Sequence, residues 1–122
     1  MKLTPDQAAK IFSILTANVL GVVSTNSATG FPQAAVVAVS ETDTLEIIFA
    51  TFNDTRKFFN LLTDPRVAVV MGWNNDDKRT LQMEGRARLV EGPEVESIAS
   101  IHCTKSAGSR RFGMIRVSGI LS

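Results

Sequence analysis

The chain has 122 residues, of which 44% are hydrophobic and 20% are charged, and its formal net charge is +1. This length predicts a single domain over residues 1–122, and the near-neutral charge gives no electrostatic basis for binding nucleic acid or an anionic membrane. No apolar run is long enough for a transmembrane helix, no signal peptide is recognisable, and one cysteine excludes an internal disulfide, so we expect a cytoplasmic protein.

Capping and alternation predict one helix and three strands in the first part of the chain. Thr4 and Gln7 form a capping box around Pro5, which is favoured at the first helical position, so a helix begins here. Runs rich in β-branched and aromatic residues predict three strands over residues 19–24, 31–39 and 45–51. A tight turn over residues 40–44 is predicted to join the second strand to the third.

The second of these strands is apolar on both faces. Residues 34–39 read AAVVAV. A strand buried on both sides is typical of a barrel wall that another subunit covers, so we expect a homodimer. The same small side chains would let a flat ligand lie against the backbone.

The third predicted strand is followed by a short polar turn and a second helix. Asn53 and Asp54 supply turn and N-cap chemistry between them. Phe58, Leu61 and Leu62 share one helical face, which we expect to be buried. The strand therefore leads through a short polar turn directly into a helix.

Two cations fall in the first turn of that helix. Arg56 and Lys57 lie where free N–H groups and the macrodipole favour anions. Either they are solvated surface charges, or they hold an external anion such as a phosphate together with the Thr55 hydroxyl. The residues alone leave both interpretations open.

The second half of the chain predicts three more strands and one more helix, which begins at residues 92–94. Residues 105–111 are predicted to form a flexible basic loop. The strands are expected over residues 66–73, 79–90 and 112–121. Six strands with mostly short connections predict a mainly β (α+β) fold with antiparallel pairing, in which the strands form a closed or split barrel with short flanking helices.

The side chains offer little catalytic chemistry of their own. His102 and Cys103 are neighbours on the last predicted helix, so they point about 100° apart and cannot form a nucleophile pair. We interpret His102 as a helix-end residue and Cys103 as a small apolar filler, and no metal site is predicted. Glu46 and Glu84 are not paired as acid and base, so an enzyme with this sequence would depend on a cofactor.

Four segments of the chain carry a family resemblance. The most specific is the pattern F-x-T-x-x-x-[ST]-R-K, formed by Phe49, Thr51, Thr55, Arg56 and Lys57. The segments read TGFPQAAVVAV, FATFNDTRKFFNLL, DPRVAVVMGW and TLQMEGRARLV. In these segments the chain resembles the FMN-binding split β-barrel family related to pyridoxamine 5′-phosphate oxidase.

The resemblance implies a six-stranded antiparallel split β-barrel of Greek-key type, an FMN cofactor, and a homodimer with flavin at the interface, and it leaves the small-molecule substrate unknown. In the family, the pattern around Arg56 and Lys57 binds the FMN phosphate, and the strand at Ala35–Ala38 lines the isoalloxazine ring. A polar contact from Thr80 or Gln82 is also implied, often across the dimer interface. The cofactor-binding residues expected from the resemblance are Ala35, Val36, Val37, Ala38, Ala50, Thr51, Thr55, Arg56, Lys57, Thr80 and Gln82.

The chain also departs from the true oxidases. These carry an arginine at the position of Ala35, a lysine at Ser40 and a glutamine at Thr80, and their C-terminal Arg/His motif has no counterpart after Phe112. We therefore expect an FMN-dependent oxidoreductase acting on an unknown small molecule, not a vitamin B6 oxidase. The alternatives are a non-catalytic flavin-binding or sensing module, the same fold with deazaflavin F420 or haem, and a plain structural dimer.

Overall fold

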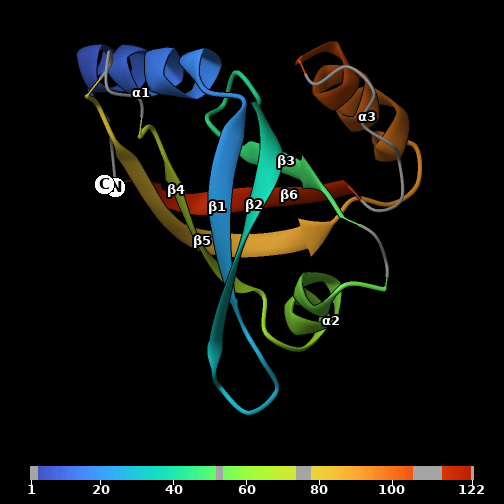
Figure 1. The fold of residues 1–122 in the computed structure, drawn as a ribbon. Coiled ribbons are helices and arrows are strands. Elements are labelled where there is room, and N and C mark those ends of the chain that lie inside the picture. Colours follow the sequence, from blue (N-terminus) through green and yellow to red (C-terminus); the bar gives the residue numbers. More distant parts are fainter. Residues whose placement is uncertain (1–2, 52–53, 74–77, 106–113, 122) are drawn as a thin grey trace.

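The strands close into one antiparallel barrel. The computed structural model describes residues 3–51, 54–73, 78–105 and 114–121. Its strand order is β1–β2–β3–β6–β5–β4, and β4 pairs back with β1 (Figure 1). The elements are α1 (Pro5–Ala17), β1 (Leu20–Asn26), β2 (Pro32–Glu41), β3 (Ile47–Ala50), α2 (Arg56–Thr63), β4 (Arg66–Met71), β5 (Leu81–Leu89), α3 (Glu94–Lys105) and β6 (Met114–Leu121). The predicted mainly β barrel with short flanking helices is confirmed.

The barrel interior is the main hydrophobic core, and β5 shows how the sequence fills it. Leu81, Met83 and Ala87 point inward and are buried, while Gln82 and Glu84 between them are exposed. This is the alternation expected of a strand with one wet face. The same interior holds the inward side chains of the other strands, together with residues from α1 and α2: Ile14, Leu15, Val23, Val37, Val39, Ile47, Phe49, Leu61, Val67, Val69, Met71, Ile115 and Val117.

The three helices cover different parts of the barrel (Figure 1). α1 begins at the predicted capping box, in which the Gln7 N–H donates to Thr4 Oγ1 over 3.2 Å and the Thr4 N–H donates to Gln7 Oε1 over 2.9 Å. α3 covers a second, smaller cluster of buried residues, namely Ile48, Val90, Ile98 and Ala99. α2 lies beside the β1–β2 hairpin, and the residues at its start line a cavity together with residues of that hairpin.

The turn between β2 and β3 differs from the prediction. Ser40 and Glu41 belong to β2, and β3 begins only at Ile47. Leu45 was expected in the strand, but it has a φ of +64° and its N–H donates to the Thr42 carbonyl over 3.1 Å. A left-handed residue of this kind closes a turn and cannot continue a strand.

The predicted N-cap and buried face of α2 are also corrected. Thr55 is the N-cap, because its side chain accepts a bond from the Phe58 N–H over 3.4 Å; Asp54 lies in the preceding turn and Asn53 lies outside the described residues. Leu61 is buried as predicted, but Leu62 is 62% exposed, and Asn60 is buried in its place with 8% of its surface exposed.

α3 buries a polar residue that the sequence placed at a helix end. His102 lies within α3 and is only 1% exposed, whereas Ile101 is 39% exposed. The His102 Nδ1 atom lies 2.7 Å from the hydroxyl of Ser40, which is also buried. A polar side chain can be buried at low cost when it finds such a partner, and hydropathy alone does not reveal one. The predicted basic loop falls outside the described residues except for Lys105, which ends α3.

Candidate functional site

The connection from β3 to α2 is held by two threonines. Thr51, which follows β3, is buried, and its hydroxyl lies 2.8 Å from that of Thr55. Thr55 in turn caps α2. The threonine pair fixes where α2 begins, and with it the direction of its first two N–H groups, which have no acceptor within a helix.

Arg56 and Lys57 occupy the first two positions of α2, as predicted. Arg56 is exposed and Lys57 is half-buried. The ion pairs between described residues involve other cations, so no carboxylate neutralises these two side chains there. Two unneutralised cations and two free N–H groups therefore point from one helix end, an arrangement that attracts an anion.

A cavity of about 170 Å³ lies between this helix end and the β1–β2 hairpin. We call it the α2 cavity. Its lining combines small or apolar strand residues with the cationic helix end: Val23, Thr25, Gln33, Ala34, Ala35, Thr55, Arg56 and Lys57. Four of the expected cofactor residues meet here, namely Ala35, Thr55, Arg56 and Lys57.

The other expected residues of β2 divide between its two faces. Val37 points into the barrel and is buried, like its neighbour two positions along, Val39. Val36 points outward and is 60% exposed, and Ala38 is half-buried on the same side. In the single chain, β2 is therefore covered on one face only. Ala50, at the end of β3, packs near the small cluster under α3.

Thr80 and Gln82 lie away from the α2 cavity within one chain. The Thr80 hydroxyl donates to the Gly72 carbonyl over 2.9 Å, where the chain turns from β4 toward β5. Gly72 has a φ of +87°, and a Cβ there would lie 2.3 Å from the Arg79 carbonyl oxygen, so only glycine fits. Gln82 lies on the outward side of β5, opposite Val70.

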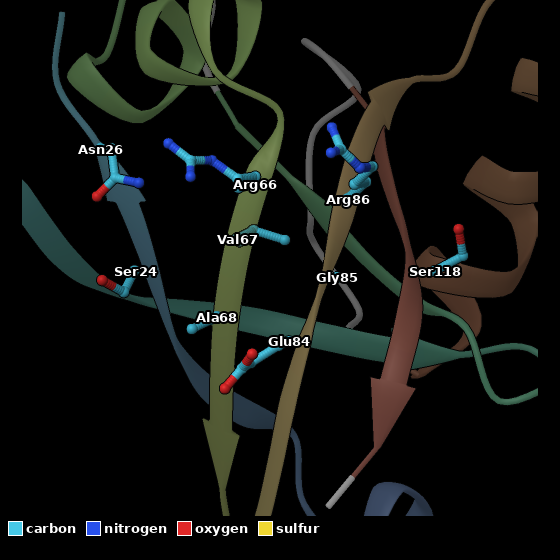
Figure 2. A pocket seen from close by; sticks show the side chains of 9 residues that line it. All are labelled: Ser24, Asn26, Arg66, Val67, Ala68, Glu84, Gly85, Arg86 and Ser118. Carbon is cyan, nitrogen blue, oxygen red and sulfur yellow. The ribbon is translucent and has the colours of Figure 1, made fainter. Parts of the chain in front are cut away.

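A larger groove of about 570 Å³ runs over the outside of the barrel (Figure 2). Arg66 and Arg86 lie at one end of it and Glu84 at the other. Hydrogen bonds from Arg66 hold the pKa of the Asp64 carboxyl well below its usual range. Arg86 forms no ion pair with the described residues. The groove lining comprises Ser24, Asn26, Arg66, Val67, Ala68, Glu84, Gly85, Arg86 and Ser118.

A second, smaller groove of about 180 Å³ adjoins this one and shares Ser24, Ala68 and Glu84 with it. The strand register places Ala34, Ser24, Ala68 and Glu84 in one row across β2, β1, β4 and β5. We call this surface the outer face. It consists of Ala34, Val36, Val22, Ser24, Ala68, Val70, Gln82 and Glu84, with Arg66 and Arg86 at one end.

Ionic contacts tie α3 to the barrel. Arg116 on β6 bonds both Glu46, before β3, and Glu94, at the start of α3. Arg88 bonds the same Glu94 oxygen over 2.8 Å, and this bond, followed by that from Arg116, lowers the pKa of Glu94. Because these groups neutralise one another, we assign them to the attachment of α3.

The described residues contain no group of three or more His, Cys, Asp or Glu side chains that could hold a metal ion. Within the same part of the chain, no helix is both long and apolar enough to cross a membrane. The α2 cavity and the grooves of the outer face are candidate sites that need neither a metal ion nor a membrane.

A family model described as pyridoxamine 5′-phosphate oxidase matches residues 8–118, so the chain belongs to this family. A comparison with curated proteins found no match.

Solved structures share the fold at low sequence identity. A Listeria innocua protein with the provisional name pyridoxamine 5′-phosphate oxidase is 21% identical, with a TM-score of 0.79 and coverage of 94% of this chain and 95% of that one. A haem-binding protein from Mycobacterium smegmatis is 18% identical, with a TM-score of 0.79 and coverage of 97% and 53%. An F420 reductase is 20% identical, with a TM-score of 0.72 and coverage of 90% and 94%. Proteins of this fold are thus named for different ligands.

Proposed function

We propose that the chain is an FMN-binding flavoprotein whose phosphate site is the amino end of α2. The observation that carries this proposal is the α2 cavity, which brings Arg56 and Lys57 against the small side chain of Ala35. Charge-assisted bonds from both cations, with the N–H groups of the first helical turn, suit a phosphate monoester. The small residues of β2 leave space for a flat ring beside the strand.

The proposed reaction class is an FMN-dependent oxidoreduction of a small molecule. A bound flavin supplies the electron chemistry, and the protein supplies binding and orientation. In this chain Arg56 and Lys57 would anchor one end of the cofactor, the Thr51–Thr55 pair would keep the helix end in place, and β2 would cover one side of the ring. None of these roles needs an acid–base pair from the protein, in agreement with the lack of one among the residues that line the cavity.

We further propose that two copies associate through the outer face. Most of its residues are small or apolar, a carboxylate, Glu84, lies in the same row as Ala68, and the two arginines lie at one end. A two-fold axis brings each residue opposite a different residue of the other copy, so such a face can be complementary to itself. The partner's Thr80 and Gln82 could then reach a flavin that they cannot reach within one chain.

Haem and deazaflavin F420 are the competing ligands, because structurally similar proteins are named for them. Haem iron is usually held by His, Cys, Met or Tyr, and the described lining of the α2 cavity contains none of these. His102, the only histidine of the chain, belongs to α3 and is buried beside Ser40. The lining therefore favours a flavin or deazaflavin over haem.

Purified protein mixed with FMN is expected to retain it through gel filtration and to show flavin absorption in the blue. The measurement is the absorption spectrum of the protein as purified and after reconstitution with FMN, deazaflavin F420 or haem. A Soret band, a deazaflavin band alone, or no retained FMN would contradict the proposal.

The protein is expected to lack steady oxidation of pyridoxamine 5′-phosphate. The oxidases carry cations at two positions where this chain has Ala35 and Ser40, and Ser40 is 1% exposed and bonded to His102, so a substrate cannot reach it. Oxygen consumption and aldehyde formation measure the activity, with a true oxidase assayed in parallel as the positive control. Sustained turnover by the FMN-loaded protein would refute this expectation.

A further inference from the structure

A buried amide connects α2 to the strands that form the other wall of the α2 cavity. Asn60 lies one turn beyond Arg56, on the side of α2 that packs against β1 and β2, and is 8% exposed. Its Nδ2 group donates to Thr25 Oγ1 over 2.9 Å and to Gln33 Oε1 over 2.8 Å. Both of its N–H bonds are thus used, one on each strand.

The contact with Asn60 determines which end of Gln33 remains for a ligand. The Gln33 carbonyl oxygen accepts the Asn60 bond, so its other end is an NH2 group, which can only donate. Among the described residues, every buried polar side-chain atom has a hydrogen-bond partner. The Gln33 NH2 group has no partner among them, so it is not buried and is accessible to a ligand. Gln33 lines the α2 cavity together with Arg56 and Lys57.

We propose that Gln33 is a ligand-binding residue that donates from its NH2 group to an oxygen of the bound flavin nucleotide, and that Asn60 is the positioning residue that orients it. This inference rests on the proposed function, because it names a contact with that ligand. The oxygen belongs either to the phosphate or to the ribityl chain and ring, and both accept hydrogen bonds. Asn60 acts from behind the site: its side chain is buried and is not part of the cavity lining.

The test measures the affinity of FMN and riboflavin for wild type and for Gln33→Met and Gln33→Glu. Gln33→Met removes the donor and is expected to weaken FMN about 2- to 10-fold, the range for one neutral hydrogen bond. Gln33→Glu still accepts from Asn60 but presents an oxygen to the ligand, so the expected loss is larger. Equal losses for both ligands identify a ribityl or ring oxygen, and a loss confined to FMN identifies the phosphate.

Two further variants separate positioning from folding. Thr63→Val removes a side-chain hydrogen bond on the same helix, that to the Phe59 carbonyl, at an exposed position outside the cavity lining, and is the matched control expected to bind like wild type. Asn60→Leu is expected to weaken binding in the wild-type background but to add no further loss to Gln33→Met, because it acts through Gln33. If Asn60→Leu does not fold, the two Gln33 variants still decide whether Gln33 donates to the ligand.

Several results would overturn the inference. Wild-type affinity in Gln33→Met excludes the contact, wild-type affinity in Gln33→Glu shows that the amide faces the other way, and additive losses for Asn60 and Gln33 exclude positioning. In each of these cases wild type still binds FMN, so the proposed function stands. If wild type binds neither flavin, the proposed function itself is wrong, and the inference falls with it.

Discussion

Arg56→Ala is expected to weaken FMN binding about 10- to 150-fold and to leave riboflavin binding nearly unchanged. Arg56 begins α2, lines the α2 cavity, and forms no ion pair with the described residues. A charge-assisted contact of this kind contributes roughly 1.5–3 kcal/mol, which gives the stated range. Riboflavin lacks the phosphate and therefore lacks the partner that Arg56 would bind.

The apo protein should tolerate this substitution. Removing a cation from a helix amino end is neutral or slightly stabilising, because the macrodipole disfavours positive charge there. Titration of both ligands, with the Tm of each apo protein, measures the two effects, and Lys10→Ala on α1 serves as the control for loss of an exposed cation. Equal losses for FMN and riboflavin, or no loss for either, would remove the phosphate role from Arg56.

The barrel could be predicted because its signals are local. The alternation in β5 depends on neighbours two residues apart, and the capping box of α1 on neighbours three apart. The position of Arg56 and Lys57 in the first turn of α2 follows from the same short-range pattern, even though the N-cap is Thr55 and not Asn53 or Asp54.

The buried polar contacts could not be predicted because their partners are distant in the sequence. Asn60 bonds Thr25 and Gln33, which lie 35 and 27 positions away, and His102 bonds Ser40 at a separation of 62. Periodicity assigns a polar residue to the wet face of a helix unless a partner is known. The only sequence signal for the burial of Asn60 is its position next to the apolar Leu61, and this signal is weak.

The residues expected to bind the cofactor are divided between two places in the single chain. Arg56, Lys57, Thr55 and Ala35 line the α2 cavity together. Thr80 and Gln82 do not join them, because strand register places them toward the end of β4 and away from the β1–β2 hairpin. A sequence pattern does not state which copy of a chain supplies a residue. The separation of Thr80 and Gln82 from the α2 cavity is therefore the main reason to test whether two copies associate.

Ala68→Glu is expected to dissociate the proposed dimer and to release FMN with it. Ala68 lies at the centre of the outer face, exposed, directly opposite Glu84 on β5. In a two-fold contact Arg86 would already balance Glu84, and Arg66 is paired with Asp64, so the new carboxylate would be buried without a counter-ion of its own. An uncompensated buried charge costs roughly 3–5 kcal/mol, or about 100- to 5,000-fold in the dissociation constant. FMN is lost because the contacts expected from the partner's Thr80 and the partner's Gln82 are lost.

Sedimentation of wild type and Ala68→Glu at micromolar concentration, with FMN absorption followed in the same run, measures both quantities. Ala9→Glu places the same carboxylate on an exposed alanine of α1 and should leave the dimer and its flavin intact. The Tm of each apo protein separates dissociation from unfolding, because an exposed alanine on a barrel strand tolerates a charge in the single chain. A wild-type monomer that retains flavin would exclude the shared site. A dimeric Ala68→Glu variant would move the contact away from the outer face, since two copies would there bury four carboxylates against only two arginines that lack a carboxylate partner among the described residues, one Arg86 on each copy.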